Sequence, residues 1–325
     1  MNAPVLSAIV MTPDTWHTMR RTLAALRGQT LRHSIELVLV GPSLEALDVP
    51  EAEIAGFAQV RKTAAPPSPR ILGESSAAGV RSASAALVVF TEDHCFPEPG
   101  WAEALVKFHA DGNWAGVEPT FINGNPDSVA SKVQFLVEYA HSAPGEAKGE
   151  APFIAGHNSC YRRDALLHYD RDGGLADWLE VEFLMHQDMG RRGLRLGRSA
   201  EARTHHYNCS RVGATLSFSW VFPRVFAAHR ARRLGPVQRL KLALTWPLIA
   251  PLRFQRIWPL AWRLYGTAAA LRLSPLLLAN LMVSAASEGA GYVLGAGRHP
   301  ELAFGLEFHR DRFFRSGDRF PDVEA

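Results

Sequence analysis

The chain has 325 residues, of which 47% are hydrophobic and 21% charged, so it can bury a full core and is not a disordered protein. Its three cysteines lie far apart without any C-x-x-C spacing, which argues against a disulfide framework and a zinc knuckle. The net charge of +3 conceals two halves of opposite sign. Residues 1–190 hold 14 Lys and Arg against 24 Asp and Glu, whereas residues 191–325 hold 21 against 8.

The first half predicts alternating strands and helices. An apolar strand over Val5–Met11 is followed by "DTWHTMRRTLAALRGQ", whose apolar residues recur at helical spacing, and by a second strand over Ile35–Gly41. A small-residue helix over 74–85 then leads into the strand "ALVVF" at 86–90. This order predicts an α/β fold with a mostly parallel sheet, whose ligands bind beyond the carboxyl ends of the strands.

Three polar residues, Glu92, Asp93 and His94, follow that strand at the expected ligand edge. Carboxylate and imidazole are ligands for a divalent ion such as Mn²⁺ or Mg²⁺, which could neutralise a diphosphate there. The alternative is a helix cap, because a helix is expected to begin at Pro99 to Trp101 and acids favour a helix N-terminus. The local residues leave both interpretations open.

Four stretches in order resemble the motifs of family-2 glycosyltransferases. They cover roughly residues 5–210 and are "AAGVRSASAALVVFTEDHCFPEPGWAEAL", "PFIAGHNSCYRRDALL", "DWLEVEFLMHQDMGRRGLRL" and "ARTHHYN". The resemblance implies a GT-A fold, a nucleotide-sugar donor, with a UDP-sugar favoured, and transfer with inversion at the anomeric carbon.

The resemblance also implies roles for residues on the donor side. Glu92 and Asp93, together with Thr12 and Pro13 after the first strand, would bind the donor nucleotide and its diphosphate. The metal ligands would be Asp93, His94 and His206, with His205 as the adjacent alternative to His206. A lone histidine is more often structural than a ligand, so both interpretations of the "THHYN" pair stand.

On the acceptor side, Glu182 would be the general base that takes the proton of the acceptor hydroxyl, and Glu180 is its rival. Positions two apart on a helix face different sides, so only one of the two should enter the cleft. Gly156, Asn158 and Trp101 would line the acceptor site, with Trp178 as a further stacking surface. His186, one helical turn after Glu182, either orients that carboxylate or serves packing, and the structural role is favoured.

The chain also departs from the family pattern. The aspartate that usually ends the second strand is replaced by Gly41, Pro42 and Ser43, so recognition of the base is altered. The terminal element of processive synthases is missing, which favours a single transfer over polymerisation. The alternative function is a catalytically degenerate relative that binds a sugar nucleotide or a partner at the membrane.

The second half predicts a membrane-associating region. Residues 202–287 contain twelve Lys and Arg and no Asp or Glu, and the basic residues are interleaved with apolar runs that suit a lipid surface better than nucleic acid. We therefore expect a catalytic domain over 1–212 and a helical region over 213–325 attached to the cytoplasmic side of the cell membrane. In-plane attachment is favoured, with a spanning or re-entrant segment near 273–297 left open and a soluble helical subdomain as the alternative. The acceptor is then expected to be a lipid or a lipid-linked glycan.

Overall fold

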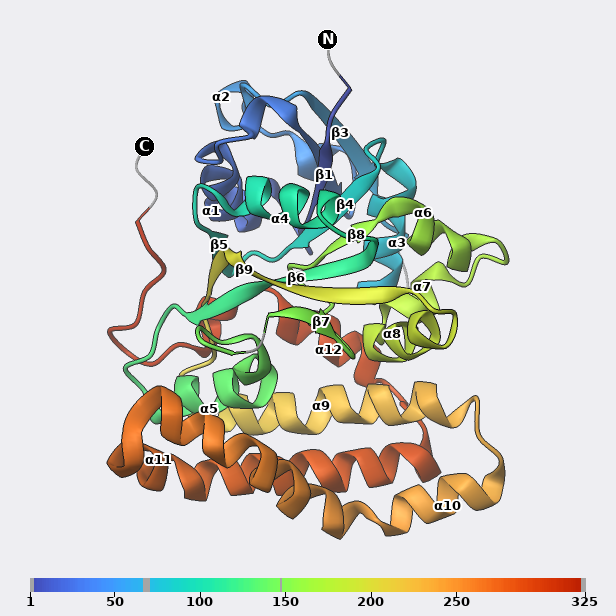
Figure 1. Cartoon of the computed structure of the whole chain (residues 1–325), viewed down its shortest axis with the longest axis vertical. Helices are drawn as coiled ribbons and strands as arrows, with labels where there is room; N and C mark the ends of the chain where they lie inside the picture. Colours follow the sequence, from blue (N-terminus) through green and yellow to red (C-terminus); the bar gives the residue numbers. More distant parts are fainter. Residues whose placement is uncertain (1–2, 67–70, 147, 323–325) are drawn as a thin grey trace. The chain divides into compact units, whose positions relative to one another are not determined.

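The computed structural model describes residues 3–66, 71–146 and 148–322, and the chain divides into two compact units (Figure 1). One unit consists of Met1–Ile122, Ser142–His206 and Pro321–Ala325, and the other of Asn123–His141 and Tyr207–Phe320. The boundary expected after residue 212 thus lies at 206/207, and the second unit also takes residues 123–141, which the sequence analysis assigned to the first.

The first unit is built on one sheet of nine strands within the described residues, in the order β3-β2-β1-β4-β8-β6-β9-β5, with β7 beside β9. The strands β1 to β4 pair in parallel, whereas β8 joins β4 and β6 antiparallel, and β9 pairs antiparallel with β5 and β7. The predicted α/β class is therefore confirmed, and its parallel part comprises the first four strands. The strands are β1 Leu6–Met11, β2 Ile35–Gly41, β3 Gln59–Ala64, β4 Leu87–Thr91, β5 Cys95–Pro97, β6 Trp114–Asn123, β7 Gly149–Ala151, β8 Cys160–Arg162 and β9 Arg195–His206.

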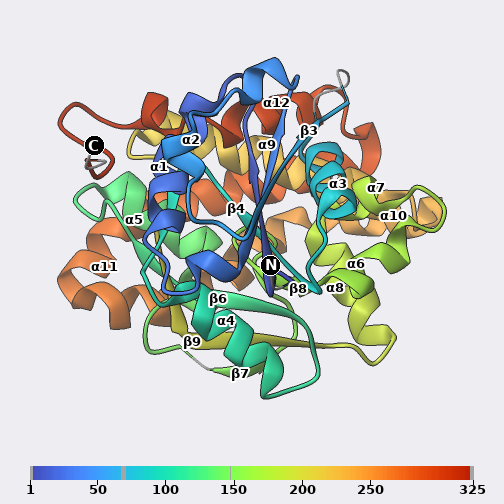
Figure 2. The same cartoon turned by 90° about the horizontal axis from the view of Figure 1, so that it is seen from above.

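Helices cover both faces of the parallel strands (Figure 2). Successive side chains of a strand point to opposite faces, so Ala8 and Val10 pack with the buried side of α1 while Ile9 faces α3. Gly79 of α3 allows the close approach, because a Cβ there would lie 2.4 Å from Ile9 Cγ2. The helices of this unit are α1 Trp16–Arg27, α2 Glu51–Ile54, α3 Leu72–Ser82, α4 Trp101–Ala110, α6 Arg163–Leu167, α7 Leu175–Leu179 and α8 Glu182–Arg191.

The second unit is helical. Its longest helix, α11, is interrupted at Gly266, whose backbone adopts φ 77° and ψ 167°, whereas Pro251, Pro259 and Pro275 lie within helical backbone. By length and composition α11 is the one described helix that could cross a membrane, and 39% of its apolar window is buried. The helices of this unit are α5 Val129–Glu138, α9 Val212–Ala231, α10 Pro236–Leu244, α11 Trp246–Leu294 and α12 His299–Glu307.

Candidate metal and substrate site

A tight turn at the carboxyl end of β4 carries the acidic and imidazole groups. Glu92 begins the turn, and its carbonyl accepts hydrogen bonds from the Cys95 amide (3.4 Å) and from the Thr22 hydroxyl of α1 (2.7 Å). The chain then enters β5, where Cys95 pairs with His206 in antiparallel register. This pairing brings a histidine from more than 100 positions later in the chain to the turn.

Glu92, His94 and His206 form a buried cluster that could hold a metal ion. One ligand atom from each lies within 4.8 Å of the other two. Oε2 of Glu92 is 3.5 Å from His94 Nε2 and 3.6 Å from His206 Nε2. The two imidazole rings meet edge to face with their centroids 4.8 Å apart. The structure thus brings together one carboxylate and two imidazoles that could bind a metal ion at the predicted edge of the sheet.

Asp93, which was predicted as a metal ligand, is not one of these three residues. Its Oδ1 lies 2.7 Å from His94 Nδ1. A carboxylate in this position fixes the orientation of an imidazole and leaves Nε2 to face an ion. Asp93 therefore contacts and orients His94, and it is not itself one of the three candidate metal ligands.

The two neighbouring histidines of β9 face opposite sides of the strand. His206 is fully buried in the cluster, whereas the half-exposed His205 lies 3.1 Å from Glu98 Oε1. Alternation of side chains along a strand is the reason, because adjacent residues cannot face the same side. Of the two alternatives left open by the sequence, only His206 reaches the cluster.

Asn158 forms two side-chain hydrogen bonds with Glu92. Its Nδ2 donates to Glu92 Oε2 at 2.6 Å, and its Oδ1 accepts from the Glu92 amide at 3.2 Å. Asn158 is 2% exposed and adopts φ 58°, a left-handed conformation that asparagine tolerates better than most residues. The prediction that its amide binds acceptor hydroxyls is corrected, since both ends of that amide are used to orient Glu92.

Glu182 and Gly156 lie side by side. A Cβ at position 156 would be 2.3 Å from Glu182 Cδ, so the absence of a side chain at Gly156 leaves space for this carboxylate. Glu182 is the first residue of α8, where the positive end of the helix dipole favours the ionised form. The predicted role of Gly156 in close contact with a sugar stays a prediction, and its observed contact is with the candidate base.

His157 is a site residue that the sequence analysis missed. Its Nδ1 lies 3.3 Å from Glu92 Oε1 and 3.9 Å from Glu182 Oε1, so one partly exposed imidazole connects the metal cluster to the candidate base. The signal in the sequence was its position between Gly156 and Asn158, two residues that were both singled out.

Glu180, the rival of Glu182, has a structural contact. Its Oε2 accepts a hydrogen bond from the Gly73 amide at 2.7 Å, which satisfies a donor in the first turn of α3. His186 also has a structural contact, because its Nε2 lies 2.8 Å from the Tyr161 hydroxyl and burial lowers its pKa to about 3. Its ring is therefore neutral near pH 7.

Trp101 belongs to the hydrophobic core. It is 1% exposed and packs in the cluster formed around α1, β1 and β2, so the prediction that its ring stacks on an acceptor sugar is wrong. Trp178 packs against Tyr169 with ring centroids 5.0 Å apart.

Thr12 follows β1 at the same edge of the sheet as Glu92, since Val10 pairs with Thr91. Its hydroxyl donates to Thr15 O at 2.7 Å. The role of Thr12 and Pro13 in donor binding stays a prediction.

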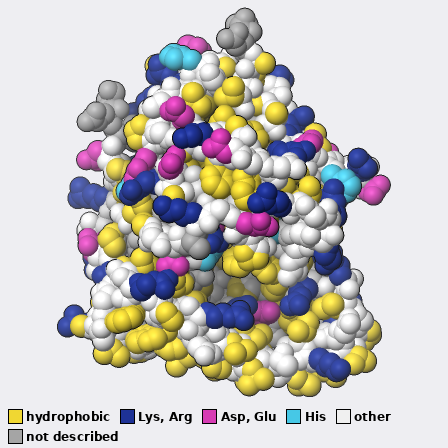
Figure 3. All heavy atoms as spheres, viewed as in Figure 1, with side chains coloured by type: hydrophobic (Ala, Val, Ile, Leu, Met, Phe, Trp, Pro, Cys, Tyr) yellow, Lys and Arg dark blue, Asp and Glu magenta, His cyan; other side chains and the backbone are white. Residues whose placement is uncertain are grey.

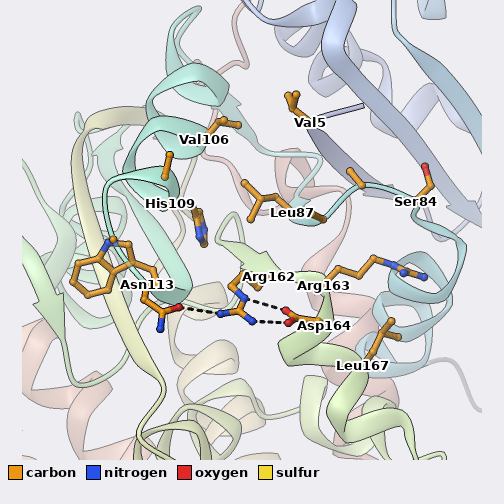
Figure 4. Close-up of a pocket in the computed structure, with 15 residues that line it drawn as sticks. Val5, Ser84, Leu87, Val106, His109, Asn113, Arg162, Arg163, Asp164 and Leu167 are labelled. Carbon is orange, nitrogen blue, oxygen red and sulfur yellow. Dashed lines mark hydrogen bonds and ion pairs between the residues drawn. The ribbon is translucent and has the colours of Figure 1, made fainter. Parts of the chain in front are cut away.

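A separate hollow of about 790 Å³ lies at the opposite end of β4 (Figure 4). Its polar groups pair with one another: Arg162 donates to Asn113 Oδ1 at 3.0 Å and forms an ion pair with Asp164. Arg163 donates to the carbonyls of Val80 and Arg81 at the end of α3. Arg162 and Arg163 are therefore engaged in structural contacts, and the candidate functional site is the one at the carboxyl end of β4.

Comparison of the chain with models of known protein families finds no match, and comparison with curated protein sequences finds none either.

Proposed function

We propose that the chain is a metal-dependent inverting glycosyltransferase that moves one sugar from a nucleotide-diphosphate donor to a hydroxyl acceptor. The observation that carries the proposal is the buried group of Glu92, His94 and His206 at the ligand edge of a parallel sheet, with Glu182 connected to it through His157. The four-motif resemblance supplies the reaction class.

The cluster would hold a divalent ion, which supplies positive charge against the diphosphate as it leaves. Two imidazoles and one carboxylate suit a transition ion such as Mn²⁺ better than Mg²⁺, which prefers oxygen ligands. Asp93 and Asn158 would keep His94 and Glu92 oriented. Of the two ions expected from the sequence, the donor set therefore favours Mn²⁺.

Glu182 would act as the general base. It takes the proton of the acceptor hydroxyl as the acceptor oxygen bonds to the anomeric carbon and the bond from that carbon to the diphosphate oxygen breaks. Its side chain is 19% exposed, so an acceptor can reach it. Gly156 leaves space for the carboxylate, and the competing Glu180 is already bonded to α3.

A second candidate is a catalytically degenerate protein that binds a sugar nucleotide or a partner at a membrane. One observation favours it: Gly41 ends β2 where the family usually carries an aspartate, and a Cβ there would lie 2.8 Å from Leu47 Cδ2. An aspartate at this position would require Leu47 to shift, and Gly41 itself has no carboxylate to make the usual contact with the base.

The acceptor is proposed to be a lipid or lipid-linked glycan at the cytoplasmic side of the membrane. The support is the acid-free, basic and apolar segment over residues 202–287 together with the apolar helix α11.

The experiment is a calorimetric titration of UDP, GDP and dTDP into the full chain, with and without Mn²⁺. We expect binding of one nucleotide, UDP, only when Mn²⁺ is present, its loss in His206→Ala, and its retention in the matched control His205→Ala. Absence of nucleotide binding under all conditions would contradict the transferase and leave only the degenerate alternative that binds a partner. Once an acceptor is found, Glu182→Gln should abolish turnover while binding UDP normally, whereas Glu180→Gln should remain active.

A further inference from the structure

The two halves of α11 form a closed hairpin inside the helical unit. Gly266 breaks the helix, and the segments before and after it run back along each other: Arg253 donates to Ser284 Oγ at 3.0 Å and to Glu288 Oε2 at 2.7 Å. A Cβ on Gly289 would lie 3.0 Å from Trp246 Cβ, so the two ends of the hairpin also meet. The acidic Glu288 is thus neutralised within the protein.

A line of leucines on the surface of this unit is exposed to solvent and is not covered by any residue that the structure describes. Each of its four members is more than half exposed. Two lie four residues apart on α10 and two lie four residues apart in the first half of α11, and this spacing keeps each pair on one side of its own helix. The line consists of Leu240, Leu244, Leu248 and Leu252. Large apolar side chains exposed in a row mark an interaction surface.

Exposed basic side chains lie on the same two helices as the leucine line. Lys241, Arg256 and Arg272 are exposed and form no ion pair with any residue that the structure describes, in contrast to Arg253. On the face seen in Figure 3, hydrophobic and basic side chains lie interspersed over the helices of this unit. The surface therefore offers apolar area and uncompensated positive charge together, which fits the headgroup region of an anionic bilayer.

We propose that the α10–α11 hairpin lies in the plane of an anionic membrane surface and does not cross it. The leucine line would enter the acyl boundary while Lys241, Arg256 and Arg272 stay at the phosphates, as long basic side chains do at interfaces. A crossing would carry unpaired arginines from both halves of the hairpin toward the hydrocarbon, where charges are strongly disfavoured. The inference rests on the proposed function only for its lipid acceptor and uses none of the metal-site residues.

The test is sedimentation of the full chain with vesicles of phosphatidylcholine alone or mixed with phosphatidylglycerol. We expect binding to the anionic vesicles and weak binding to the neutral ones. The triple variant Lys241→Gln, Arg256→Gln, Arg272→Gln should lose about 100-fold in affinity, or about five-fold per charge. A control removes three exposed charges of the other unit, Lys107→Gln, Arg191→Gln and Arg195→Gln, and should bind as the wild type does.

One further double variant and a carbonate wash test the apolar contact and the depth of insertion. Leu244→Gln with Leu248→Gln should abolish binding, and since both leucines are exposed the fold should persist, as checked by circular dichroism. Carbonate at high pH should release the bound protein, whereas its retention would establish a spanning segment and overturn in-plane attachment. Equal binding to both vesicle types, or binding unchanged in the triple variant, would also overturn the proposal.

Self-association is the competing use of this surface. If the wild type forms dimers without lipid and the leucine variant is monomeric, the surface is an interface between copies and the proposal fails. Two controls separate failure of this inference from failure of the proposed function. The variants that no longer bind vesicles should still bind UDP, and His206→Ala, which should lose UDP binding, should still bind vesicles.

Discussion

The contact between Asn158 and Glu92 predicts a linked loss of stability and metal affinity. Asn158→Gly keeps the positive φ without steric cost and removes both side-chain hydrogen bonds to Glu92. A bond to a charged group contributes about 1.5–3 kcal/mol and a neutral one about 0.5–1.5 kcal/mol, so the free energy of unfolding should fall by about 2–4.5 kcal/mol. Asn158→Ala should lose about 1 kcal/mol more, because a Cβ is disfavoured at this φ.

Urea unfolding followed by tryptophan fluorescence measures the first effect, and titration with Mn²⁺ measures the second. Because Asn158 orients a ligand, either variant should weaken Mn²⁺ binding about 10- to 100-fold. Arg162 pairs with Asn113 at the opposite end of β4, so Asn113→Ala is a control that should leave Mn²⁺ affinity unchanged. A loss below about 1 kcal/mol, together with unchanged Mn²⁺ affinity, would refute this account of the contact.

Three other predictions concern pH and the candidate base. Burial raises the pKa of Glu36, but hydrogen bonds from its neighbours lower it below 4.5 overall. The stabilisation that Glu36 gives is therefore present above pH 4.5 and is lost as the pH falls through the lowered pKa. When the free energy of unfolding is measured against pH, Glu36→Gln should show a smaller loss of stability on the acid side. His186, with a folded pKa of about 3 against 6.5 unfolded, should make the fold lose stability as the pH falls from 6.5 toward 3, and His186→Phe should reduce that slope in the same measurement. Gly156→Ala should displace the Glu182 carboxylate by about 1 Å and lower turnover about 100-fold with UDP affinity retained; equal turnover would show that Glu182 does not need its observed position.

Local patterns were enough to find three of the four parallel strands, β1, β2 and β4, and the turn that carries Glu92, whereas the half-exposed strand β3 was missed. Apolar runs identify buried strands, and a polar triplet after such a run identifies a ligand edge. The partner of that turn depends on antiparallel pairing between β5 and β9, a contact far apart in sequence that no local pattern encodes. Only the motif resemblance indicated His206 beforehand.

The errors came from residues whose type fits two environments. Trp101 was assigned to a sugar because its ring can stack, yet the first turn of α4 places it in the core. Asn158 was assigned to hydroxyls, yet a left-handed backbone turns its amide to Glu92. In α11 the break falls at Gly266, which alone in that helix adopts a non-helical φ and ψ, whereas its three interior prolines lie within helical backbone.

The most direct test of the central claim is electron paramagnetic resonance of Mn²⁺ bound to the full chain without nucleotide. The account predicts one bound ion with hyperfine coupling to imidazole nitrogen, lost in His206→Ala and kept in His205→Ala. An ion bound through oxygen ligands only, or bound equally well by His206→Ala, would contradict a metal site at Glu92, His94 and His206.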